Sequence, residues 1–195
     1  VNLGNDRVGM ILGDVSGKGV PAALYMVRAI SEYRFLASQT NDPAELITQL
    51  NQKLSGQSFF GMFITMVCLI IDKNSGVVQY SSAGHLPILL RRAADASTEL
   101  LKGTQGVPLG LLPDTPFFLN TAKLEKGDAL FLYTDGVTEA RNKNSSEYTV
   151  ERLASCLKEP SSSAEGYLER ICRDVHRFSA GAGQHDDITA LAVVI

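Results

Sequence analysis

Three hydrophobic runs in this chain border aspartates, and this pattern constrains the fold more than any other feature. Asp14 follows the run VGMIL, Asp135 follows ALFLYT, and Asp186 and Asp187 precede ALAVVI. Each run is typical of a buried strand, and an aspartate at a strand end is presented to water or to a cation. Three such ends, about 120 and 50 residues apart, indicate strands that converge on one acidic site. Oxygen ligands favour the hard cations Mg²⁺ or Mn²⁺ over zinc.

The chain has 195 residues, which is enough for one domain with a substantial core. Its hydrophobic content of 45% and charged content of 20% are those of an ordinary globular protein and exclude disorder of the whole chain. The formal net charge of −3 gives no general attraction to nucleic acid, and no run of Lys and Arg appears in the sequence.

The cysteines and the hydrophobic pattern predict a cytoplasmic protein. Cys68, Cys156 and Cys172 lack CxxC or zinc-site spacing and are flanked by apolar residues, so we expect reduced thiols in the core. The longest apolar stretch, 62–71, is interrupted by Thr65 and falls short of the roughly 20 residues of a membrane span. The sequence contains no signal-peptide pattern.

The order of predicted elements favours an α+β class. A strand over 8–12 precedes a helix with Pro21 in its first turn, and Asp42 is placed to cap a second helix with Pro43 at N1 and Glu45 at N3. Strands without intervening helices predict mainly antiparallel sheets. The further predicted strands are 61–72, 77–84, 85–92, 97–101, 116–124, 128–135 and 187–195, and the further helices are 147–158 and 163–180.

The segment GDVSGKG (13–19) invites comparison with a phosphate-binding P-loop, but its spacing excludes one. Gly13 precedes Gly17 by four residues where a P-loop requires five, and Gly19 stands where a Ser or Thr would bind magnesium. The glycines instead allow close approach of the backbone beside the carboxylate of Asp14.

Five separated motifs resemble the metal-dependent PPM-type serine/threonine phosphatases, and specifically their bacterial SpoIIE/RsbU branch. The resemblance covers nearly the whole chain and keeps the order of the motifs in that family. The motifs are GDVSGKGVPAAL (13–24), SAGHLPILL (82–90), GVPLGL (106–111), GDALFLYTDGVTEARN (127–142) and HDDITALAV (185–193).

The resemblance implies a four-layer α-β-β-α sandwich of two mainly antiparallel sheets flanked by helices, with residues 1–195 forming a single phosphatase domain. It implies that Asp14 bridges two Mn²⁺ or Mg²⁺ ions, joined by the carbonyl of Val15. Asp135 and Asp186 would complete the ligands, with Asp187 as the alternative to Asp186. These ions would activate a water molecule that attacks phosphorus.

One expected motif is absent. The family has a further aspartate motif, of GDFYD type, shortly before GDVSGKG, and residues 1–13 do not contain it; Asp6 lies in a predicted GNDR turn and is a poor substitute. We therefore expect an N-terminally truncated domain that lacks the first strand and one metal ligand, and that forms the C-terminal output module of a longer protein. Whether this chain alone is active is open.

Other polar residues near the motifs have alternative interpretations. His185 either assists proton transfer or lies in a turn, and Lys18 either steers a phosphate or is a solvated loop lysine. For His85 we expect an orienting hydrogen bond rather than a catalytic role, and for His176 we expect a position on the surface of a helix. The helix pair at 20–55 follows Asp14 and is the place where we expect regulation.

Two functions of different classes follow from these observations. The first is a phosphoserine/phosphothreonine protein phosphatase in bacterial signalling, with an anti-sigma-factor antagonist or a similar phosphoprotein as substrate and with an upstream regulatory domain in the same polypeptide. The alternative is a catalytically inert, phosphatase-like binding scaffold, which the absent ligand favours and the three retained aspartates oppose. A two-metal nuclease would call for basic residues near the site, and the sequence gathers none there.

Overall fold

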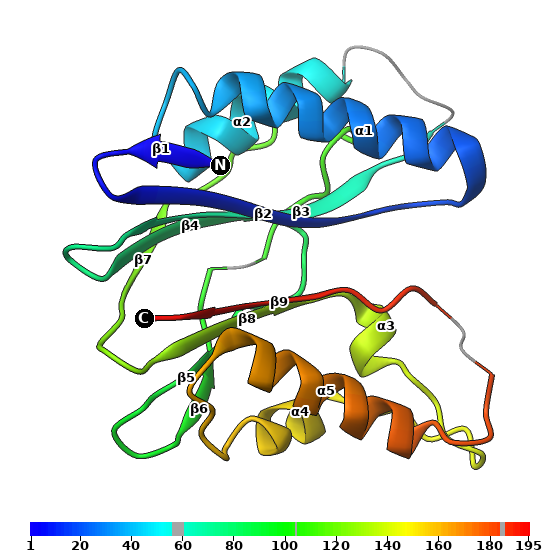
Figure 1. Ribbon diagram of the computed structural model, residues 1–195. Helices are drawn as coiled ribbons and strands as arrows, with labels where there is room; N and C mark the ends of the chain where they lie inside the picture. The colour runs from blue at the N-terminus through cyan, green and yellow to red at the C-terminus, as the bar shows by residue number, and fades with distance from the viewer. Residues whose placement is uncertain (56–60, 104, 184–185) are drawn as a thin grey trace. The chain divides into compact units, whose positions relative to one another are not determined.

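The chain folds into two compact units, which are described separately. The computed structural model describes residues 1–55, 61–103, 105–183 and 186–195. The first unit contains Val1–His85 and Lys102–Lys123, and the second unit contains Leu86–Leu101 and Leu124–Ile195. Each unit has one antiparallel sheet with helices on it (Figure 1).

The sheet of the first unit is a meander extended by a late strand. Its order is β1-β2-β3-β4-β7, and every neighbouring pair is antiparallel. β2 pairs with β3 along its whole length, from Arg7 opposite Asp72 to Val15 opposite Ile64. The strands are β1 (Asn2–Gly4), β2 (Arg7–Val15), β3 (Ile64–Asp72), β4 (Val77–Ala83) and β7 (Asn120–Lys123).

Two helices, α1 (Gly19–Leu36) and α2 (Pro43–Ser55), cover one face of this sheet (Figure 1). The predicted cap of α2 is present, because Asp42 Oδ1 accepts hydrogen bonds from the backbone N–H of Ala44 at 2.7 Å and of Glu45 at 3.2 Å. Burial of apolar side chains between helices and sheet supplies the main stabilisation. The core includes Tyr25, Ala29, Tyr33, Leu36, Leu46, Ile47, Leu50, Leu54, Ile64, Met66, Cys68 and Ile70.

The second unit has a four-stranded antiparallel sheet in the order β6-β5-β8-β9. Helices α4 and α5 cover it, and their apolar side chains pack on β8 (Figure 1). Its elements are β5 (Leu89–Arg91), β6 (Thr98–Leu100), β8 (Ala129–Tyr133), α3 (Asp135–Thr138), α4 (Val150–Cys156), α5 (Ala164–Phe178) and β9 (Ala190–Val194).

The predicted α+β class with two antiparallel sheets and helices is confirmed. Two predicted strands were too long, because the strand expected over 85–92 is reduced to β5 and the one over 116–124 to β7. Pro87 and Pro116 lie in the parts that are not strand, and proline cannot donate a hydrogen bond to a sheet.

The prediction of three core thiols was wrong for two of them. Cys68 on β3 is buried, whereas Cys156 is half-buried and Cys172 is exposed. Cys172 follows the buried Ile171 on α5, so an apolar neighbour in sequence points to the opposite side of an amphipathic helix. None of the described helices is long and apolar enough to cross a membrane.

Candidate metal centre

Asp135 begins α3 and follows the fully buried strand β8 after one residue, Thr134. One of its carboxylate oxygens, Oδ1, is buried and has no hydrogen-bond partner among the residues that the structure describes. A buried carboxylate oxygen without a partner carries a large desolvation cost, which a cation removes. The second unit therefore holds an acidic oxygen in the environment of a metal ligand.

The end of β8 is joined to the segment that leads into β9. Thr134 Oγ1 donates to the carbonyl of Asp187 at 3.2 Å and accepts from the N–H of Thr189 at 3.1 Å. Gly136 lies against the same segment, and a Cβ atom at this position would come within 2.1 Å of the carbonyl oxygen of Asp187. Only glycine permits this approach, which brings the TDG motif and Asp186–Asp187 to one corner of the second unit.

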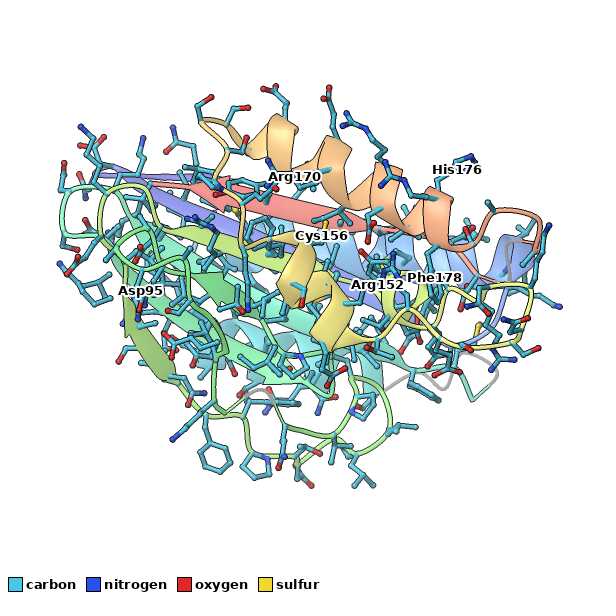
Figure 2. All side chains as sticks on the ribbon, turned by 90° about the horizontal axis from the view of Figure 1, so that it is seen from below. Asp95, Arg152, Cys156, Arg170, His176 and Phe178 are labelled. Carbon is cyan, nitrogen blue, oxygen red and sulfur yellow. The ribbon has the colours of Figure 1, made fainter. Side chains whose placement is uncertain are left out.

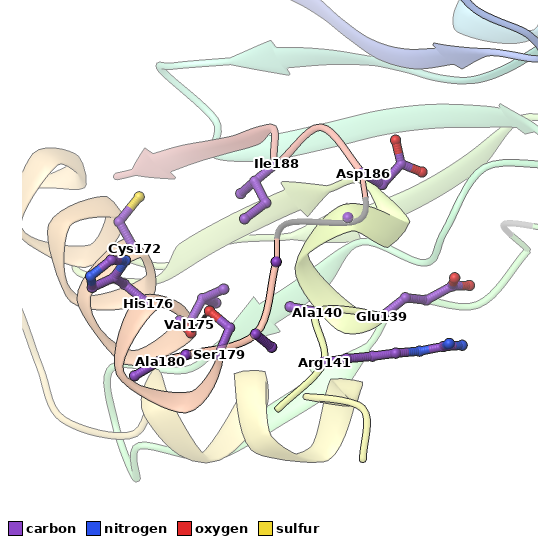
Figure 3. A pocket seen from close by; sticks show the side chains of 14 residues that line it. Glu139, Ala140, Arg141, Cys172, Val175, His176, Ser179, Ala180, Asp186 and Ile188 are labelled. Carbon is purple, nitrogen blue, oxygen red and sulfur yellow. Dashed lines mark hydrogen bonds between the residues drawn. The ribbon is translucent and has the colours of Figure 1, made fainter. Parts of the chain in front are cut away.

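A cavity of about 800 Å³ opens at this corner, between α3 and α5. Figure 3 shows Asp186, Glu139 and Arg141 on one side of the pocket, with Cys172 and His176 of α5 on the other. Asp186 Oδ1 accepts a hydrogen bond from the N–H of Asp187 at 2.8 Å. Asp186 thus borders a hollow large enough for a ligand.

In the first unit, Asp14 and Val15 are the last two residues of β2. Asp14 pairs with Thr65 and Val15 with Ile64 across the β2–β3 ladder. Gly13 is required for this pairing, since a Cβ atom there would lie 2.8 Å from the carbonyl oxygen of Thr65. Beyond the strand, Gly17 and Gly19 have φ angles of 102° and 78°, in the left-handed region that favours glycine.

The hydrogen bond predicted for His85 is present. His85 is buried, and its Nδ1 lies 2.9 Å from Thr65 Oγ1. Thr65 Oγ1 also lies 3.5 Å from the carbonyl oxygen of Asp14, so these contacts connect the histidine to the end of β2. His176 is exposed, as predicted for a helix surface. Lys18 is also exposed, which fits both of its interpretations, and His185 lies outside the described residues.

The predicted ligands are divided between the two units. Asp14 and Val15 belong to the first, and Asp135 and Asp186 belong to the second. Among the described residues, no group of three or more His, Cys, Asp or Glu side chains is placed to hold a metal ion. The full ligand set therefore stays a prediction, and the second unit by itself contributes two aspartates.

Thr65 and Thr134 were missed as parts of the site. The sequence carries a signal for Thr65, which is a polar residue between the apolar residues of β3 and interrupts a hydrophobic run. Thr134 is buried between β8 and Asp135, and a buried hydroxyl requires partners. Its partners come from residues 187–189, more than fifty positions away, which the local sequence does not reveal.

Comparison with protein families matches residues 4–195 to the family described as Stage II sporulation protein E (SpoIIE). The chain belongs to the SpoIIE family. The phosphoserine phosphatase RsbU of Bacillus subtilis is 32% identical over 139 residues, which cover 71% of this chain and 41% of RsbU. The chain spans 34–41% of the length of its curated relatives.

Solved structures show the same fold at lower identity. The PP2C phosphatase domain of SpoIIE from Bacillus subtilis matches with a TM-score of 0.85 and 19% identity, over 100% of this chain and 56% of that one. RsbX, solved in complex with magnesium, matches with a TM-score of 0.71 and 20% identity, over 96% of this chain and 81% of RsbX. The fold of this SpoIIE-family chain is thus that of PP2C phosphatase domains.

Proposed function

We propose that this SpoIIE-family chain is a metal-dependent phosphoserine/phosphothreonine protein phosphatase of bacterial signalling. In this proposal residues 1–195 form one catalytic domain, with Asp14, Asp135 and Asp186 and the carbonyl of Val15 as ligands of two Mn²⁺ or Mg²⁺ ions. The observation that carries the proposal is the buried Oδ1 of Asp135, which has no hydrogen-bond partner among the described residues and so fits a divalent cation.

Neighbouring residues hold and orient these ligands in each unit. Thr134 and Gly136 keep Asp135 next to the Asp186–Asp187 segment. Thr65, which contacts His85, pairs with Asp14 in the β2–β3 ladder. Divalent cations, when bound, lower the pKa of water and neutralise the charge of a phosphoryl group.

The substrate and the partners are inferred from relatives. RsbU and RsbP are phosphoserine phosphatases, so a phosphorylated protein is the substrate class, and an anti-sigma-factor antagonist is the specific candidate. The chain spans less than half of these relatives, which supports an upstream regulatory domain in the same polypeptide.

Regulation through α1 is proposed because α1 begins four residues after the end of β2, where Asp14 and Val15 lie. The inert scaffold is not favoured, because the matched relatives RsbU and RsbP are phosphoserine phosphatases.

The proposal is tested by hydrolysis of p-nitrophenyl phosphate with Mn²⁺ or Mg²⁺, alongside calorimetric titration of each ion. Asp135→Asn is expected to lower the rate by more than about a hundredfold, because metal sites are sensitive to loss even of supporting groups. Asp114→Asn, in an exposed loop, is the matched control and should retain full activity.

A version extended upstream by about thirty residues, enough for a hairpin, is assayed in parallel, because the resembled family places a further aspartate there. Activity of either version that Asp135→Asn removes supports the phosphatase. Metal binding without hydrolysis in both versions would favour the inert scaffold, and an active Asp135→Asn variant would refute the role given to Asp135.

A further inference from the structure

A groove on the second unit collects four arginines that are scattered in the sequence. Arg170, Arg173 and Arg177 follow one another at i, i+3 and i+7 along α5, so they share one face of that helix. Arg152 of α4 lines the same groove, together with Ser155, Cys156, Glu159 and Asp174. Figure 2 looks onto this surface and shows Arg152 and Arg170 along α4 and α5. We call these residues the arginine groove. The sequence contains no run of Lys and Arg, so this cluster is formed by the fold.

Two of the arginines are held in place by the protein. Arg152 donates to both oxygens of Asp174, from Nε at 3.1 Å and from Nη2 at 3.3 Å, and its guanidinium lies 4.6 Å from the ring of Phe178. Hydrogen bonding from Arg152 lowers the pKa of Asp174, which keeps that carboxylate charged. Arg170 donates to the carbonyls of Glu159 and Pro160. These contacts form the fixed wall of the groove.

The other two arginines are available to a ligand. Within the described part of the chain, neither Arg173 nor Arg177 forms an ion pair or a side-chain hydrogen bond, and both are exposed. Four arginines against the carboxylates of Glu159 and Asp174 leave a formal excess of two positive charges in the groove. This excess stands on a chain whose formal net charge is −3, so it is a local feature.

We propose that the arginine groove binds an acidic segment of a partner protein, whose carboxylates pair with Arg173 and Arg177. Guanidinium groups recognise carboxylates in two-point geometry, and arginine clusters are used to bind acidic or phosphorylated motifs. The groove, about 500 Å³ in volume, has room for a few side chains.

The chemistry of the groove favours a polypeptide over a nucleic acid. Proteins that bind single-stranded nucleic acid commonly add base stacking on aromatic side chains to their contacts with phosphates. The rings of Tyr148 and Phe178 are covered by the guanidinium of Arg152, at 5.2 and 4.6 Å, so they provide no free surface for stacking bases.

The groove is distinct from the candidate metal centre within the second unit. Cys172, His176 and Ser179 of α5 line the pocket that Asp186 borders, whereas Arg170, Arg173 and Arg177 line the groove. One helix thus separates the two features. Binding to the groove depends neither on metal nor on catalysis, so it is testable even if the proposed function fails.

The test uses fluorescence anisotropy with a fluorescein-labelled Glu-Ser repeat peptide and its Gln-Ser counterpart. The acidic peptide should bind and the neutral one should not. The double variant Arg173→Gln/Arg177→Gln is expected to lose about tenfold in affinity, the value for two exposed charge pairs. Lys102→Gln/Lys126→Gln removes two exposed cations elsewhere and is the matched control, with a change below about twofold.

The proposal would be overturned by equal loss of affinity in the lysine control, by no loss in the arginine variant, or by equal binding of the neutral peptide. The third ligand is a single-stranded oligonucleotide of matched charge. Tighter binding of this oligonucleotide through Arg173 and Arg177 would also overturn the proposal that the occupant is an acidic protein segment. Urea unfolding confirms that both variants fold, which their exposed positions lead us to expect.

Discussion

The two units use different means to hold the acidic residues near a strand end. In the second unit, Asp135 and Asp186 are brought together by a steric fit, in which Gly136 touches the backbone of Asp187. In the first unit, Asp14 lies in a regular ladder opposite Thr65, and hydrogen bonds support it. A steric fit tolerates no added atom, whereas a ladder of many hydrogen bonds tolerates the loss of one. We therefore expect the second unit to be the more sensitive to substitution.

The two units also differ in the chemistry of one buried polar group each. In the first unit, the neutral amide of Asn51 donates to the carbonyls of Leu112 and Pro113 and accepts from the N–H of Gly110. In the second unit, the buried carboxylate of Asp128 pairs with Arg92 at 2.9 Å. A buried amide responds little to pH, whereas a buried carboxylate loses its partner when it is protonated. Acid should therefore weaken the Asp128–Arg92 pair of the second unit and leave the contacts of Asn51 in place.

The largest effect is expected for Gly136→Ala. A Cβ atom at this position would lie 2.1 Å from the carbonyl oxygen of Asp187, so the segment that leads into β9 would have to move away from Asp135. We expect a loss of about 3 kcal/mol in the free energy of unfolding, the upper range for overpacking, together with loss of the proposed activity. Urea unfolding and the phosphatase assay measure both. Gly183→Ala is the matched control, since a Cβ atom there meets no atom of the described residues within 4 Å. If the two substitutions had equal effects, a steric fit at Gly136 would not be what holds the acidic residues of the second unit.

A smaller effect, with a defined pH dependence, is expected for Asp128→Asn. Burial alone would raise the pKa of Asp128, but the N–H groups of Ala93 and Glu125 and the guanidinium of Arg92 together hold that pKa below its ordinary value. At neutral pH the substitution should cost about 2 kcal/mol, as for other hydrogen bonds to charged groups. A lowered pKa stabilises the fold above the unfolded pKa of about 3.9, and this stabilisation is lost as pH falls through the folded pKa.

Urea unfolding at pH 7 and at about pH 3.5 checks this expectation. The difference in stability between the wild type and Asp128→Asn should shrink at the lower pH. Asp114→Asn, which changes an exposed carboxylate in the first unit, should match the wild type at both values. A difference that stays constant with pH would show that Asp128 stabilises the second unit through packing alone.

The smallest effect is expected for Thr65→Val in the first unit. The substitution removes the hydrogen bond to His85 but keeps a β-branched side chain in β3. We expect a cost of about 1 kcal/mol in stability and less than a tenfold loss of the proposed activity, because the β2–β3 ladder remains. Thr98→Val, on the edge strand β6, controls for the change of side chain. A loss as large as that of Gly136→Ala would abolish the contrast between the units.

Much of this fold could be predicted because local patterns determine it. The cap at Asp42, the turn at Gly76 and the hairpin of β3 and β4 each depend on neighbouring residues, and each is present. The predicted lengths of β5 and β7 were wrong, because the hydrophobic pattern continues past prolines that cannot donate a hydrogen bond to a sheet. The partners of Thr134 and the arginine groove could not be predicted, since they arise from contacts between distant residues.

The different environments of the three thiols give this protein a built-in attachment point for a spectroscopic reporter. Burial raises the pKa of Cys68 to about 12 and also raises that of Cys156, so both are poor nucleophiles at neutral pH. Cys172 is exposed and lines the pocket that Asp186 borders. A maleimide dye will therefore label Cys172 first in the unaltered protein. Its emission can then follow the binding of ions or protein ligands beside that pocket in real time.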